Sequence, residues 1–83
     1  MTHELKTLPR FYDAVENEIK KFEVRKNDRN FKVGDTLKLF EYDPNSSEKK
    51  CCWRKIVYVL RHEDFPDGIK EGYAVLGIEK IGE

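Results

Sequence analysis

The segment 20–35 constrains the fold most, because it changes from a strand pattern to a polar loop and back again. Phe22 and Val24 alternate with charged residues, which is the period of a strand with two different faces. The next run, 26–30, contains Asn and Asp side chains that bond their own backbone, so it predicts a loop closed by Phe31 and Val33. The dipeptide Gly34-Asp35 then turns the chain into another strand. The segment therefore predicts short strands joined at close spacing.

Positive charge is concentrated in the same segment, although the chain of 83 residues has a formal net charge of +0. Three acidic residues of the segment stand against six cationic ones, which are Lys20, Lys21, Arg25, Lys26, Arg29 and Lys32. Local charge therefore says more about partners than net charge does.

Length and composition predict one folded domain over residues 1–83 with a small core and a well-solvated surface. Hydrophobic and charged residues each make up 39% of the chain. No apolar run approaches the roughly 20 residues of a membrane span, and the first residues lack the apolar core of a signal peptide. We expect a cytoplasmic monomer with no membrane partner.

One helix is predicted from Pro9 to Ile19. Its apolar residues recur at the spacing of a single helical face, and proline suits the first turn; they are Leu8, Phe11, Tyr12, Val15 and Ile19. Phe11, Val15 and Ile19 are expected to pack against a sheet, and Thr7 is the candidate cap.

Strand patterns precede and follow this helix, a weak one near Leu5 and clearer ones at 22–25, 36–42, 56–60 and 73–79. Residues 56–60 are apolar on both faces and predict the most buried strand, and Gly77 marks a bend or a close approach. Polar loops are expected at 43–50 and 62–72. The fold class is α+β: a small β-barrel, or a strongly bent, mostly antiparallel sheet of about five strands, with one N-terminal helix plugging one end. The alternative is a helix on an open three-stranded sheet.

The two cysteines, Cys51 and Cys52, are adjacent, so a strand would place them on opposite faces, one thiol buried and one exposed. Neither a disulfide nor a metal site is predicted, because no cysteine or histidine pair has ligand spacing. We expect no cofactor. His3 and His62 are interpreted as surface residues.

Several segments together resemble the ASCH domain of the PUA-like superfamily, most closely the small phage and bacterial ASCH-like domains of unknown function. They are His3–Lys6, Phe22–Phe31, Val33–Asp35 with Leu37, Leu39 and Glu41, and Gly72–Ile78. The resemblance implies a PUA-like β-barrel with a cleft near the helix end, lined by a Lys, a Glu and an Arg that match Lys20, Glu23 and Arg25. Similar domains are proposed to bind RNA, and one enzymatic branch removes an acetyl group from acetylcytidine.

The sequence departs from that enzymatic branch at its nucleophile. The branch has a threonine three residues after the Lys, where this chain has Glu23. The wider family also favours Gly two residues before the Lys and Thr directly after it, and these positions hold Glu18 and Lys21. The departures favour a binding cleft over a catalytic one, so we assign no catalytic residue.

A nucleic-acid site is predicted at Lys20, Glu23 and Arg25 with the neighbouring Lys26, Asn27 and Arg29. Cations seek phosphates, and the polar groups can bond a base edge. The competing interpretation is a solvated ladder of ion pairs between Lys21, Glu23 and Arg25.

Two further interpretations stay open around that site. Asp28 is expected to be structural, with Arg29 either paired or binding. Phe40, Tyr42 and Trp53 either stack bases or belong to the core, Trp53 being the best exposed candidate.

The leading function is a binding module for RNA or a modified nucleotide. One alternative is a small nucleoside amidohydrolase of the acetylcytidine type, with Glu23 as general base beside Lys20. The other is a phage-type protein-interaction domain, which net neutrality favours.

Overall fold

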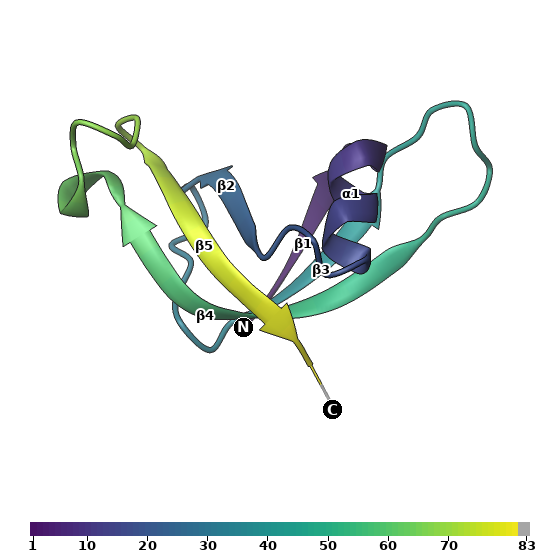
Figure 1. Cartoon of the computed structure of the whole chain (residues 1–83), viewed down its shortest axis with the longest axis horizontal. Helices are drawn as coiled ribbons and strands as arrows, with labels where there is room; N and C mark the ends of the chain where they lie inside the picture. The colour runs from purple at the N-terminus through teal and green to yellow at the C-terminus, as the bar shows by residue number, and fades with distance from the viewer. Residues whose placement is uncertain (82–83) are drawn as a thin grey trace.

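A single curled sheet carries the fold, and the computed structural model describes residues 1–81 of it. The elements are β1 (Thr2–Thr7), α1 (Pro9–Glu16), β2 (Phe22–Lys26), β3 (Thr36–Glu41), β4 (Cys51–Arg61), the short 3₁₀ helix η1 (His62–Asp64) and β5 (Tyr73–Lys80). The strand order is β1-β3-β4-β5-β2, with β1 parallel to β3 and the other pairs antiparallel. Figure 1 shows β4 curving from one arm of the molecule into the other, with β5 along it, while α1 covers the arm of β1 and β3. The predicted α+β class with a bent five-stranded sheet is confirmed, and the three-stranded alternative is wrong.

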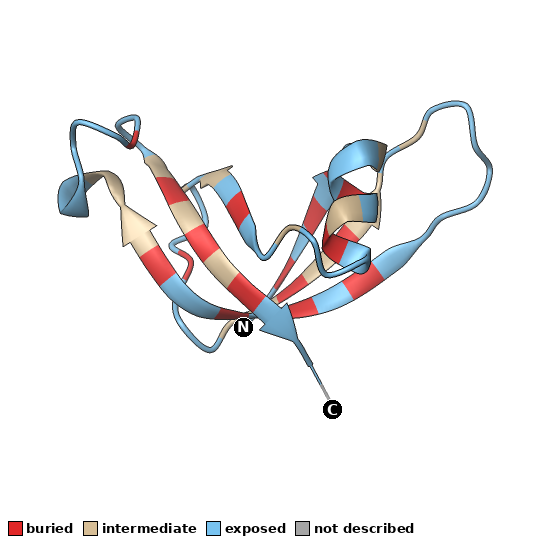
Figure 2. Ribbon diagram, in the orientation of Figure 1, coloured by how far each residue is buried: buried red, intermediate tan, exposed pale blue. Residues whose placement is uncertain are grey.

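The core fills the inner side of this half-barrel. Buried residues alternate with exposed ones along much of β4 and with half-buried ones along most of β5, as Figure 2 shows. The fully buried side chains include Leu37 and Leu39 of β3, Ile56 of β4 and Leu76 of β5. No helix among residues 1–81 is both long and apolar enough to cross a membrane.

The helix is shorter than predicted and buries a different stripe. Tyr12 and Val15 are buried, whereas Phe11 is 38% exposed and Ile19 is 79% exposed, so the expected packing of Phe11 and Ile19 is wrong. Two features coincide with the early end of the helix. Buried Arg54 on β4 donates from Nη2 to the Val15 carbonyl at 3.0 Å, and Glu18 takes a left-handed φ of 65°. Ile19 therefore lies beyond the helix.

Strand β2 lies with its charged side inward, contrary to the competing interpretation of a solvated charged face. Glu23 is only 2% exposed and Arg25 is half-buried, while Phe22 and Val24 are exposed. The interior can hold the carboxylate because two cations neutralise it there. The ion-pair ladder on a solvated face is thus contradicted, and Lys21 takes no part in the observed pairs.

Strand β4 has one buried face instead of two. Ile56 and Val59 are buried, but Val57 and Tyr58 are exposed. A register shift between Ile56 and Tyr58 places Tyr58 opposite Gly77 of β5. A Cβ on Gly77 would lie 3.4 Å from the Tyr58 Cβ, so the predicted close approach at this glycine is confirmed.

The half-barrel has a seam between its edge strands, β1 and β2. Within the described residues these two strands share no backbone pairing, and side chains bridge them instead. Arg25 Nη2 donates to Thr7 Oγ1 at 3.0 Å, and Arg29 Nη1 donates to the Glu4 carbonyl at 2.9 Å. Thr7 is therefore buried in the seam and makes no side-chain cap for the helix, which corrects the prediction.

Both histidines differ from the predicted surface residues. His3 is buried, with its Nε2 2.9 Å from Asp35 Oδ2 and its ring edge-on to Phe31. His62 is partly buried, with Nδ1 2.6 Å from the Ile69 carbonyl. The cysteines are both free, Cys52 buried and Cys51 exposed, as the strand period predicts.

Candidate functional site

A cleft of about 450 Å³ opens at the seam, between the end of β1, the start of α1 and strand β2. Its volume falls in the roughly 300–1,000 Å³ range typical of small-molecule sites. The lining residues are Lys6, Thr7, Leu8, Phe11, Lys20, Phe22, Glu23, Val24 and Arg25. The predicted convergence of Lys20, Glu23 and Arg25 on one cleft is confirmed.

These three side chains form one connected group. Lys20 Nζ contacts Glu23 Oε2 and donates to the Phe22 carbonyl at 2.6 Å. Arg25 Nε donates to Glu23 Oε1 at 3.0 Å, with Nη2 2.8 Å from the same oxygen. Both carboxylate oxygens of Glu23 are therefore engaged, one by each cation.

Strand geometry explains why the group forms. Glu23 and Arg25 are two residues apart on β2, so their side chains share the inner face. Lys20 follows the turn after α1, where the amides of Ile19 and Lys20 both donate to the Ala14 carbonyl. This turn brings the lysine back over the strand that follows it.

Apolar side chains form the rest of the cleft. Leu8 and Phe11 come from the start of α1, and Phe22 and Val24 from β2. The Lys20 ammonium lies 5.7 Å from the centre of the Phe11 ring and 4.9 Å from that of Phe22. Such an arrangement places a cation between two partly exposed rings.

The cleft is electropositive within a chain of no net charge. Lys6, Lys20 and Arg25 line it against one acid, Glu23, which leaves two positive charges. Positive charge beside aromatic rings suits an anion with a flat, apolar part.

Three predicted site residues lie outside this cleft. Lys26 ends β2 on the exposed surface. Asn27 closes the following loop, because its Oδ1 accepts the Phe31 amide at 3.2 Å and its own amide donates to the Gly72 carbonyl. Arg29 lies at the seam, where it donates to the Glu4 carbonyl.

Sequence reasoning missed the other six residues of the cleft, among them Lys6, Thr7 and Phe11. Lys6 and Thr7 come from the strand that the sequence indicated only weakly, and Phe11 belongs to a stripe whose period predicts core. What these three residues share is their place in the sequence, because all of them flank the junction between β1 and α1.

The described residues thus form a small half-barrel of five strands and one α-helix, with a charged cleft at its seam. Residues 2–78 match the family described as Domain of unknown function (DUF3850), and the chain belongs to that family. No curated protein matches the chain. A solved structure titled "Crystal structure of hypothetical protein PH0355" has a similar fold, with a TM-score of 0.64 and 16% sequence identity. The match covers 98% of this chain and 100% of that one.

Proposed function

We propose that the chain is a binding module for RNA or a modified nucleotide, and that the ligand enters the cleft at the seam. The observation that carries the proposal is the buried carboxylate of Glu23, held between Lys20 and Arg25 inside a cleft with several apolar side chains in its lining. Removing these three charged groups from water, fully or in part, costs desolvation free energy. In a small domain with a modest core, this cost is not explained by a gain in stability alone.

The chemistry of the cleft matches the parts of a nucleotide. The cationic groups attract a phosphate, and a carboxylate oxygen accepts from the amino group of a base. Phe11 and Phe22 offer partly exposed rings on which a base can stack. The resemblance to ASCH domains supports the same ligand class, because the family's Lys, Glu and Arg match the three residues that converge here.

Binding without turnover is the form that the cleft favours. Each oxygen of Glu23 already accepts from a cation, so the carboxylate is poorly placed to take a proton from an attacking water. We therefore place the amidohydrolase second to the binding module.

Adjacent lysines provide the test. Lys20 lines the cleft, whereas Lys21 is exposed outside it. We expect nucleoside monophosphates titrated into the ¹⁵N-labelled chain to shift the amide resonances of β2 and of the start of α1. Lys20→Gln should weaken that binding several-fold and Lys21→Gln should leave it unchanged, and affinity should fall as salt rises.

One observation favours a protein-interaction domain as the other candidate. Phe22 and Val24 lie opposite Gly77 and Val75, next to Tyr58, and form an exposed apolar area on the outer face of β2, β5 and β4. Resonance shifts confined to this outer face, insensitive to salt and to Lys20→Gln, would favour that candidate and contradict nucleotide binding.

A further inference from the structure

A second set of lysines and aromatic rings lies outside the cleft, on the outer face of β1, β3 and β4. We define this lysine–aromatic face by Lys6, Lys38, Phe40, Tyr42, Lys49 and Trp53. Strand register places Lys6 beside Phe40 and Lys38 beside Trp53, on the side opposite the buried leucines of β3. Tyr42 is 48% exposed and Trp53 is 46% exposed, so these rings are not core.

Two of the three lysines on this face lie over its aromatic rings. The Lys38 ammonium lies 5.0 Å from the centre of the Phe40 ring and 5.1 Å from that of Trp53, and the Lys6 ammonium lies 5.3 Å from that of Tyr42. A flat group that stacked on one of these rings would therefore have a cation next to it.

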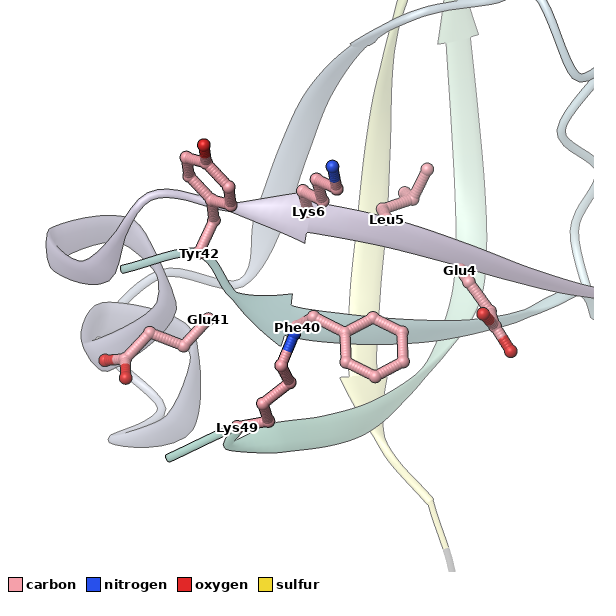
Figure 3. Close-up of a pocket in the computed structure, with 7 residues that line it drawn as sticks. All are labelled: Glu4, Leu5, Lys6, Phe40, Glu41, Tyr42 and Lys49. Atoms are coloured by element: carbon pink, nitrogen blue, oxygen red, sulfur yellow. The ribbon is translucent and has the colours of Figure 1, made fainter. Parts of the chain in front are cut away.

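A hollow of about 270 Å³ lies within the face, lined in part by Lys6, Phe40, Tyr42 and Lys49. Figure 3 shows these side chains around the ends of β1 and β3, together with Glu4 and Glu41. Lys6 lines this hollow and also the cleft of Lys20, Glu23 and Arg25. The two depressions therefore meet at the end of β1.

We propose that the lysine–aromatic face binds the single-stranded RNA that continues from the nucleotide in the cleft. The inference rests on the proposed function and extends it from one nucleotide to a strand. Three lysines and three rings offer alternating sites for phosphates and bases, which is how proteins hold single strands without reading their sequence. Charge complementarity favours RNA as the occupant of the whole face. Lys6 and Lys49 balance Glu4 and Glu41 at the hollow, and Lys38 beside it leaves the face with an excess positive charge.

Two ligands and two matched tyrosines test the proposal. The ligands are a nucleoside monophosphate and a labelled single-stranded RNA of about eight nucleotides, within the usual range of site sizes. We expect the RNA to bind at least about tenfold more tightly than the monophosphate. Tyr42→Ala should weaken RNA binding about tenfold and leave monophosphate binding unchanged, since stacking on one ring is worth that much. Tyr58→Ala removes another exposed tyrosine, from the outer face of β4 and β5, and should change neither affinity.

The chain's one tryptophan gives an independent readout, because Trp53 lies on the proposed face. We expect RNA to quench its fluorescence and the monophosphate to leave it unchanged. Equal affinities for the two ligands, or equal effects of Tyr42→Ala and Tyr58→Ala, would overturn the strand-binding proposal while the cleft remained. Absence of binding by either ligand would overturn both proposals.

Discussion

Glu23 shows how a single residue can reverse the interpretation of a strand. Alternation on β2 correctly placed Glu23 and Arg25 on one face, but the pattern alone does not tell which face lies inward. The polar assignment failed because Lys20 and Arg25 make burial of the carboxylate acceptable, and one of these cations comes from outside the strand.

Arg25 is expected to contribute to stability as well as to binding. Its guanidinium bonds both Glu23 and Thr7, so Arg25→Ala leaves a buried carboxylate with one cation fewer and a hydroxyl without a donor. We expect the free energy of unfolding to fall by about 1.5–3 kcal/mol, measured by urea denaturation. Lys26→Ala, at the exposed end of the same strand, should change it by less than about 0.5 kcal/mol. Equal stabilities for the two variants would contradict the role given to Arg25 here.

Acetylcytidine is expected to remain unhydrolysed by this chain. In the resemblance to ASCH domains, Glu23 takes the position of the threonine of the enzymatic branch, and both of its oxygens are held by cations. Release of acetate from acetylcytidine, followed over time, measures the activity. Efficient turnover that is lost in Glu23→Gln would make the amidohydrolase the better assignment.

At the scale of elements, the helix shows what periodicity leaves out. The spacing correctly located a helix starting at Pro9 and correctly buried Val15. At the end of the helix, Arg54 donates to the Val15 carbonyl from a strand 39 positions away in the sequence. A local sequence pattern cannot predict such a contact. The strand order was equally hidden, since the parallel pairing of β1 with β3 joins distant segments.

Neighbouring aromatic residues on the helix should differ sharply in their effect on stability. Tyr12 is fully buried in the core, so Tyr12→Ala should lower the free energy of unfolding by about 3–5 kcal/mol. Phe11 lines the cleft and is partly exposed, so Phe11→Ala should cost less than about 1.5 kcal/mol. Thermal or urea denaturation of the two variants measures these losses in the free energy of unfolding. A larger loss for Phe11→Ala would mean that the helix presents the originally predicted stripe to the sheet.

At the scale of the whole molecule, Asp35 ties the start of β1 to the turn before β3. Its carboxylate lies 2.9 Å from His3 Nε2 and accepts the Lys32 amide at 3.1 Å, with the Met1 amino group 3.4 Å away. The hydrogen bond with His3 is the largest cause that lowers the pKa of Asp35, against the opposing effect of burial.

Acid should therefore weaken the fold partly through Asp35. A carboxyl whose pKa is lower in the folded state stabilises the fold above its unfolded pKa of about 3.9, and this contribution is lost as the pH falls through the folded value. Between about pH 5 and pH 2 the wild type should lose more stability than Asp35→Asn, as measured by urea denaturation at each pH. Parallel pH profiles for the two proteins would show that Asp35 is not linked to folding in this way.

The seam between β1 and β2 bears on how the molecule moves. The Met1 and Thr7 carbonyls accept from the amides of Thr36 and Tyr42, on the β3 side of β1. The Lys21 carbonyl accepts from Ile78, and the Asn27 amide donates to the Gly72 carbonyl, on the β5 side of β2. Because backbone groups alternate in direction along a strand, those of Lys6 and Val24 point toward the gap. The two edges can separate by breaking side-chain hydrogen bonds from Arg25 and Arg29, while all the strand pairings stay intact. Amide hydrogen exchange at Lys6 and Val24 should be fast in the free chain and slow when a ligand fills the cleft. We therefore expect two long, rotatable side chains to set the width of the opening. Under the proposed nucleotide binding, bulkier bases would then enter without any strand being lost from the sheet.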